Sequence, residues 1–187
     1  MKVPRELYSI DCANKLEPEG IIEAGLRTVS AEVPDWSREK PRQIWDPSRR
    51  LLGAIRGYQR HSNRGPLAAM CRKYWSLQHR FWSVVTQAEI DLKCEIGGGL
   101  LIPHPNGIVI HPNVKIGPNC LIFQQVTVGG RNMEGVPIIC GHVDIGAGAK
   151  ILGDITLNSH SVVGANAVVI SDVALGTIVV GIPARPI

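Results

Sequence analysis

The chain has 187 residues, of which 44% are hydrophobic and 19% are charged, and its formal net charge is +4. This length and composition allow a sizeable buried core in one domain or two small ones. Residues 1–20 carry charges throughout, and no apolar run approaches the ~20 residues of a membrane span. We therefore expect neither a signal peptide nor a transmembrane segment, and we expect a cytoplasmic protein.

Five cysteines are scattered along the chain without a Cys-x-x-Cys pair. An odd number argues against a disulfide framework. Cys94 and Cys120 fall in a row of small residues within the repeat described below, so we expect free thiols in the core.

Composition changes near residue 88. Eight of the nine aromatic residues precede residue 83, whereas fifteen of the twenty glycines follow residue 96. The change predicts two regions, an α-helical N-terminal region over 1–88 and a β domain over 89–187.

Residues 1–43 predict one short helix, near Ile22, followed by loop. Asp46 and Pro47 then form a helix start, since Asp is a good N-cap and Pro is favoured at the first helical position. This helix should end before Gly65. A second helix is expected from Pro66, with apolar residues gathered along one side: Leu67, Met70, Cys71, Tyr74, Leu77, Phe81 and Val85.

The helical region is strongly basic. Between Arg38 and Arg80 there are eleven basic residues and two acidic ones, Glu39 and Asp46. The charge fits a solvated helix face, and it also fits contact with an anionic membrane surface, polymer or protein. No nucleic-acid-binding motif accompanies it, so we expect no nucleic-acid partner.

From Ile90 onward an aliphatic residue returns every six positions, with two interruptions, and within the unbroken runs a small or branched residue follows four positions later. A period of six fits neither a helix nor an alternating strand and is typical of a parallel β-helix built from hexapeptide repeats. The first row is Ile90, Ile96, Ile102, Ile110, Ile116, Ile122, Val128, Ile139, Ile145, Ile151, Leu157, Val163 and Val169.

The period fails twice. Two extra residues enter around 103–107, and five enter between Val128 and Ile139, which places 129–138 on an outward loop. Loops on a rigid scaffold commonly carry function, so we expect the functional groups at these two interruptions.

Several motifs around these interruptions resemble the serine acetyltransferase family of hexapeptide acyltransferases. The motifs are Ile90-Asp91, Pro103-His104-Pro105-Asn106-Gly107, Gln125-Val126-Thr127-Val128-Gly129-Gly130, the run 145–153, and Gly181-Ile182-Pro183-Ala184-Arg185. The resemblance implies a left-handed β-helix, transfer of acetyl from acetyl-CoA to the hydroxyl of L-serine, and no metal. It also implies a homotrimer with active sites between subunits, with a dimer of trimers through the helices as a further possibility.

Two departures from the family pattern concern the acceptor. Pro103 stands where the family has Asp before the catalytic His, and Gly135 and Val136 stand where it has an Arg-His pair that binds the amino-acid acceptor. The missing pair and the basic helices favour a sugar or polysaccharide hydroxyl, whereas the resemblance as a whole favours L-serine. Both acceptors stay open.

His104 is the candidate general base, because an imidazole with an ordinary pKa near 6.5 can accept a hydroxyl proton at neutral pH. By resemblance, Asp91 orients it and stabilises the imidazolium. The backbone N–H groups of Gly129 and Gly130 are candidates for the oxyanion contact. For CoA, the resemblance nominates Ala147 and Ala165 along the pantetheine arm and Arg185 near the phosphates.

Other functions compete with acetyl transfer. A zinc hydratase of the γ-carbonic-anhydrase type would need three histidines that meet, and His104, His111 and His142 are the candidates. A scaffold without catalytic activity is a further alternative. Although Ile187 resembles the terminal Ile by which family members dock a sulfhydrylase, the tail after Arg185 is two residues long. We therefore do not expect that complex.

Overall fold

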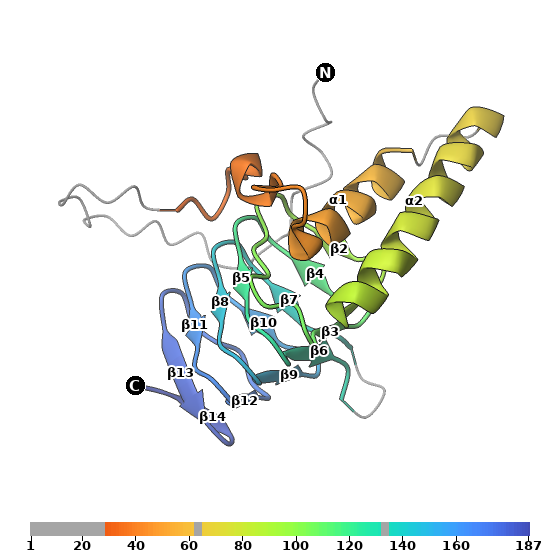
Figure 1. Cartoon of the computed structure of the whole chain (residues 1–187). Helices are drawn as coiled ribbons and strands as arrows, with labels where there is room; N and C mark the ends of the chain where they lie inside the picture. The colour runs from red at the N-terminus through yellow and green to blue at the C-terminus, as the bar shows by residue number, and fades with distance from the viewer. Residues whose placement is uncertain (1–28, 62–64, 132–134) are drawn as a thin grey trace.

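The computed structural model describes residues 29–61, 65–131 and 135–187. They form a parallel β-helix preceded by two α-helices (Figure 1), which confirms the predicted class of a mainly β chain with an α-helical N-terminal region. The short helix expected near Ile22 lies outside the described residues. Within the described ranges, no helix is both long and apolar enough to cross a bilayer.

The β-helix has three parallel sheets made of very short strands, and each coil of the chain contributes to each sheet in turn. The first sheet contains β1 (Glu89–Ile90), β3 (Val109–Ile110), β6 (Thr127–Gly129), β9 (Lys150–Leu152) and β12 (Val168–Val169). The second contains β2 (Glu95–Ile96), β4 (Lys115–Ile116), β7 (Ile138–Ile139) and β10 (Thr156–Leu157). The third contains β5 (Leu121–Ile122), β8 (Asp144–Ile145), β11 (Val162–Val163), β13 (Ile178–Gly181) and β14 (Ala184–Pro186), of which β14 runs antiparallel to β13.

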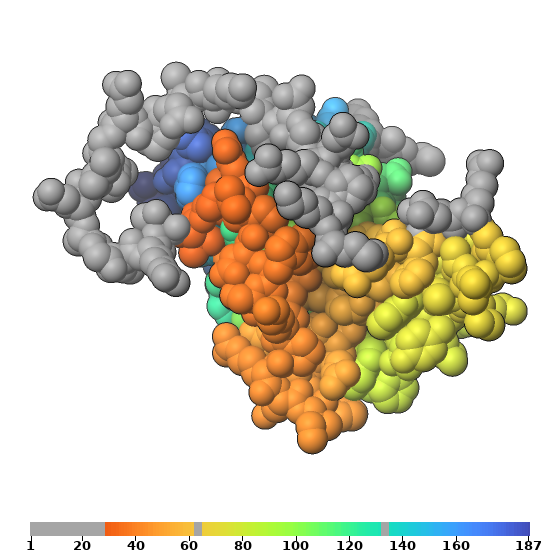
Figure 2. All heavy atoms as spheres, turned by 90° about the horizontal axis from the view of Figure 1, so that it is seen from above, coloured from red at the N-terminus to blue at the C-terminus, as the bar shows by residue number. Residues whose placement is uncertain are grey.

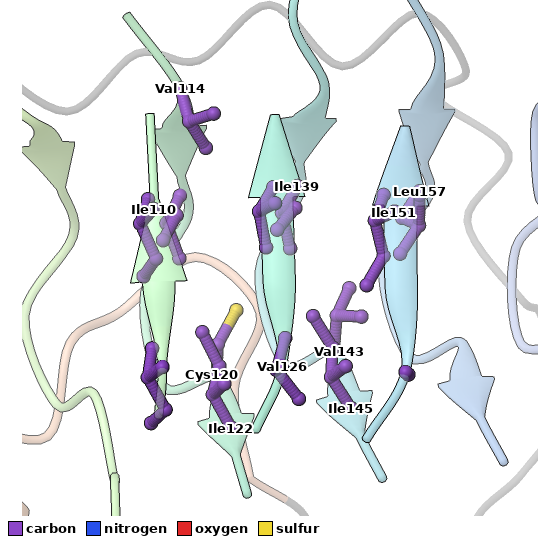
Figure 3. Packing of buried hydrophobic residues seen from close by; sticks show 14 of the residues in the cluster. Ile110, Val114, Cys120, Ile122, Val126, Ile139, Val143, Ile145, Ile151 and Leu157 are labelled. Atoms are coloured by element: carbon purple, nitrogen blue, oxygen red, sulfur yellow. The ribbon is translucent and has the colours of Figure 1, made fainter. Parts of the chain in front are cut away.

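Both rows of the hexapeptide repeat point into the core. Every residue of the aliphatic row is at most 3% exposed, and the second row, from Cys94 to Val173, is buried as well. Figure 3 shows how Ile110, Ile139 and Ile151 repeat along the interior while Val126 and Val143 fill the space beside them. The six-residue period therefore predicted the core correctly.

Turns connect the sheets along three edges of the prism. The histidine edge joins the third sheet to the first and contains 103–107, 124–125, 147–148 and 165–166. The loop edge joins the first sheet to the second and contains 91–93, 111–113, 130–137 and 153–154. The remaining edge contains 97–99, 117–119, 141–142 and 159–160.

Residues 30–39 lie along this last edge, which we call the strap edge. The Asn119 side chain accepts a hydrogen bond from the Asp35 N–H (2.8 Å) and donates to the carbonyls of Ser30 (2.7 Å) and Val33 (2.8 Å). A 3-10 helix, Trp36–Glu39, follows. This segment fixes the start of the described chain to the β-helix.

The predicted helical pair is present as α1 (Pro47–Arg60) and α2 (Pro66–Thr86). Asp46 caps α1 as expected, because its Oδ1 accepts the Arg49 N–H at 3.5 Å. Hydrogen bonds from Arg42 and Arg49 outweigh the opposing effect of burial and lower the pKa of Asp46. The two helices lie side by side at one end of the molecule (Figure 2), and α1 buries Leu51, Leu52 and Ile55 against the first coil.

The cysteines follow the prediction only in part. Cys94 and Cys120 are free and buried, as expected. Burial raises the pKa of Cys94 to about 11 and that of Cys120 to about 12. Cys140, however, is in a disulfide bond, which the odd number of cysteines had argued against.

Candidate active site

The first interruption of the repeat is a bulge on the histidine edge. Asn106 and Gly107 form the regular turn, since the Gln125 N–H of the next coil donates to the Asn106 carbonyl at 2.9 Å. Gly107 and Gln125 both adopt positive φ, at 69° and 58°, so the two turns have the same conformation. The extra residues are therefore those before the turn, and they include His104.

The side chain of His104 is exposed, and it makes no hydrogen bond to any residue in the described ranges. Its neighbour Pro103 is exposed too, whereas Ile102 and Ile108 on either side of the bulge are buried. The buried aliphatic residues anchor the bulge at both ends. An imidazole held in this way is available to a substrate at the surface.

Ala147 and Ala165 lie on the same edge as His104. The Gly148 N–H donates to the Gln124 carbonyl (2.9 Å), and the Asn166 N–H donates to the Ala147 carbonyl (2.8 Å). Successive coils of a parallel sheet are about 4.8 Å apart, so Ala165 is about 14 Å from the His104 coil. His104, the candidate base, and Ala147 and Ala165, the candidate CoA contacts, thus lie along one edge.

Arg185 is exposed on β14, opposite Val180 of β13. Val180 in turn packs against Gly164, where an added Cβ would be 2.7 Å from Val180 Cγ1. Since Gly164 directly precedes the turn that contains Ala165, Arg185 lies at the far end of the histidine edge. A cation there fits the phosphates of a ligand that runs along the edge from His104.

Asp91, Gly129 and Gly130 lie elsewhere, at the loop edge. Asp91 follows β1, and its Oδ1 accepts the Lys93 N–H at 2.7 Å. Gly129 ends β6, with its carbonyl accepting the Gly153 N–H at 3.0 Å, and Gly130 begins the loop. The first sheet separates the two edges by about four extended residues, or about 13 Å. One chain therefore does not bring these three residues to His104.

Two charged residues on the first sheet, near the histidine edge, were not among the predicted site residues. The Glu89 N–H donates to the Ile108 carbonyl (2.8 Å), and the Gly107 N–H donates to the Gln87 carbonyl (2.8 Å), so Glu89 lies next to the bulge. Lys150 donates from Nζ to the Gln125 carbonyl at 2.6 Å. Each directly precedes a residue of the aliphatic row, Ile90 or Ile151, and so points outward from a strand of the first sheet. A charged residue at this position of the repeat was the sequence signal that could have identified them.

The three histidines nominated for a zinc site lie on three different edges. His104 is on the histidine edge, His111 on the loop edge and His142 on the strap edge. His142 instead contacts His160, with 2.7 Å between their Nδ1 atoms. Among the described residues there is no group of three or more His, Cys, Asp or Glu side chains placed to hold a metal ion.

The outward loop lies between β6 and β7, over 130–137, one residue shorter at each end than the predicted 129–138, and residues 132–134 within it lie outside the described ranges. Gly135 packs against Asp154, where an added Cβ would be 2.8 Å from the carboxyl carbon. A larger residue at position 135 therefore requires Asp154 to move. Val136 is half-buried and packs against the core rather than pointing outward.

No protein-family model matches the chain. It is 39% identical over 107 residues to the serine acetyltransferase of Synechococcus elongatus, which is 56% of this chain and 44% of that protein. It is 45% identical over 103 residues to the serine acetyltransferase of Staphylococcus xylosus, which is 54% of this chain and 48% of that protein. The matched part thus spans less than half the length of these relatives.

Solved structures show the same likeness. A serine acetyltransferase in complex with CoA has a TM-score of 0.65 and 28% identity, and the match covers 77% of this chain and 58% of that one. Soybean serine acetyltransferase apoenzyme has a TM-score of 0.62 and 33% identity, with 75% and 56% covered. The fold and the shared sequence place the β-helix among the hexapeptide-repeat acyltransferases.

Within that class, the matched part of this chain is similar to serine acetyltransferases. The family resemblance indicated by the motifs around His104 and Gly129 is thereby confirmed.

Proposed function

We propose that the chain is an acetyl-CoA-dependent O-acetyltransferase that acetylates the hydroxyl of L-serine to give O-acetylserine. The observation that carries the proposal is the histidine edge, where His104, Ala147, Ala165 and Arg185 form one line. The proposal is supported by the likeness to serine acetyltransferases, including structures in complex with CoA and with cysteine.

His104 is the general base in this proposal. Its imidazole takes the proton of the acceptor hydroxyl as the oxygen attacks the thioester carbonyl. The C–S bond then breaks, and the protonated imidazole returns its proton to the leaving thiolate of CoA. A positioned base of this kind contributes about 10²–10⁴-fold to the rate.

The oxyanion contact comes from a neighbouring copy. Because Gly129, Gly130 and Asp91 lie on the loop edge, they can serve His104 only where the loop edge of one copy faces the histidine edge of another. A homotrimer with sites between subunits meets this requirement. Within one chain, Glu89 is the carboxylate beside the bulge, and it is a second candidate for orienting the imidazole.

One observation favours a different acceptor. Gly135 and Val136 offer no charged side chain to an amino acid, and a larger residue at position 135 would require the Asp154 side chain to move. A saccharide hydroxyl, which needs no charged partner, is therefore the second candidate acceptor.

The test is CoA thiol release from acetyl-CoA in the presence of L-serine, homoserine or a panel of sugars. The proposal expects turnover with L-serine and a loss of about 100-fold or more in His104→Ala. Turnover with a sugar but not with L-serine would identify a saccharide hydroxyl as the acceptor of the same acetyl transfer. Absence of turnover with every acceptor would leave a scaffold without catalytic activity.

A further inference from the structure

Helix α2 turns a long apolar face to solvent. Six large side chains follow heptad spacing on this face and are 51–78% exposed: Leu67, Met70, Tyr74, Leu77, Phe81 and Val84. We call these six residues the α2 stripe. At 1.5 Å per residue, the stripe extends over about 26 Å from Leu67 to Val84.

The opposite face of α2 is fixed, so the stripe cannot turn inward. Trp75 packs so closely against Gly57 of α1 that a Cβ added at Gly57 would clash with its ring. The His79 Nε2 lies 2.8 Å from the Ile90 carbonyl of the first coil. Figure 1 shows α2 as the outer of the two helices, on the side away from the β-helix.

Basic residues accompany the stripe. Lys73 and Arg80 are exposed and line a shallow groove of about 510 Å³ together with Met70, Tyr74 and Leu77. Neither α1 nor α2 contains an Asp or Glu residue. The stripe is thus an apolar surface with a cationic margin.

The acidic residues nearby do not offset this charge. Glu39 and Asp46 are the two acidic residues between positions 38 and 80. Glu39 is held by Arg56 at 2.8 Å and Asp46 by Arg49 at 3.1 Å, and both carboxylates are largely buried. The exposed charge of the helical region is therefore positive.

This charge decides between possible occupants. Two copies paired through the stripe gain no opposite charge, because neither helix carries one, and an antiparallel pair sets Lys73 against Arg80. An anionic lipid surface accommodates both features. Its acyl region receives the apolar side chains, while lysine and arginine extend to the phosphates.

We propose that the α2 stripe docks on the surface of a bilayer that contains anionic phospholipid, with α2 lying in the plane of the interface. Lys73 and Arg80 contact the headgroup phosphates, and Leu77 and Phe81 enter the apolar layer. This function is independent of acetyl transfer, since the stripe contains none of the residues assigned to the active site.

The test is flotation of the full chain with vesicles of phosphatidylcholine alone or mixed with phosphatidylglycerol. The proposal expects binding to the mixed vesicles, with weaker binding at higher salt. The variant Lys73→Glu/Arg80→Glu should lower the partition coefficient by about 30-fold or more. Leu77→Glu/Phe81→Glu should abolish binding, whereas Ile187→Ser and Lys93→Glu, at exposed positions elsewhere, should bind as the unaltered chain does.

Circular dichroism of each variant checks that the helices are retained. Lack of binding to the mixed vesicles overturns the proposal, as does equal binding by the stripe variants. Sedimentation velocity tests the remaining alternative, in which a second copy of the chain binds the α2 stripe. If Leu77→Glu/Phe81→Glu dissociates an oligomer of a chain that does not bind vesicles, the stripe is an interface between copies and the proposal is wrong.

Discussion

The Glu39 carboxylate and the Arg56 guanidinium form an ion pair at 2.8 Å that joins the 3-10 helix to α1. Glu39 also accepts the N–H groups of Gly99 (2.8 Å) and Leu100 (3.1 Å) in the first coil. Arg56 donates to the Gly97 carbonyl (2.6 Å) and stacks on Trp36. One buried pair thus connects the strap, α1 and the β-helix.

Removal of one partner of this pair should be costly. Glu39→Ala leaves the Arg56 charge buried and two backbone N–H groups without an acceptor, so we expect a loss of about 3–5 kcal/mol in the free energy of unfolding. Glu39→Gln should cost less, because its amide oxygen can still accept. The measurement is urea unfolding followed by circular dichroism.

The matched control is Glu95→Ala, which removes an exposed ion pair with Lys115. We expect a change of at most about 1 kcal/mol there. Similar losses for Glu39→Ala and Glu95→Ala would contradict the structural role assigned to Glu39.

In the proposed mechanism, Glu89 and Asp91 are alternative candidates for orienting His104, and matched amide variants distinguish between them. Glu89 lies beside the bulge in the same chain, whereas Asp91 must come from a neighbouring copy. We expect Glu89→Gln to lower kcat/KM for the acceptor by about 10–100-fold and to shift the pH profile of the rate, with a smaller effect for Asp91→Asn. The reverse order would identify Asp91, acting across a subunit boundary, as the orienting group.

The contact between His142 and His160 predicts a dependence of stability on pH. Burial disfavours the charged ring and, together with the positive charge of a protonated His160, lowers the pKa of His142 from 6.5. Arg38 acts in the same direction, and Asp144 opposes it. The folded chain therefore binds fewer protons than the unfolded one, so the free energy of unfolding falls as the pH drops below 6.5 toward the lowered value.

The measurement is the difference in Tm between about pH 7.5 and about pH 5.5. His142→Asn should reduce this difference, and Asn tolerates the positive φ of 52° at this position. At the higher pH, a lower Tm of the variant reports the lost contact with His160, whereas a smaller difference in Tm between the two pH values reports the lost titrating group. An unchanged pH dependence rejects His142 as its source.

The buried thiols should resist alkylation. With pKa values of about 11 for Cys94 and about 12 for Cys120, almost no thiolate forms at neutral pH. Cys71 is half-buried on α2 and should react first of these three. Iodoacetamide treatment followed by peptide mass analysis, with and without guanidinium, tests this order, and labelling of Cys120 in the folded protein would count against a closed core.

The core could be read from the sequence because in a β-helix the same positions of every hexapeptide point inward. Ile90 through Val169 keep that spacing, and the two interruptions, at His104 and at the loop before Ile138, stand out against it. Burial of these side chains depends on local periodicity alone, so no tertiary information was needed.

The tertiary structure decided which side chains share an edge. His104, Ala147 and Arg185 align because hydrogen bonds between coils set the register, whereas Asp91 and Gly129 fall one sheet away. It also decided that α2 faces solvent with Leu77 and Phe81, because Trp75 and His79 occupy the inner contacts. The spacing of apolar residues in a sequence predicts an apolar face on a helix. Only the packing of the folded chain determines whether that face is buried within the chain or exposed to solvent.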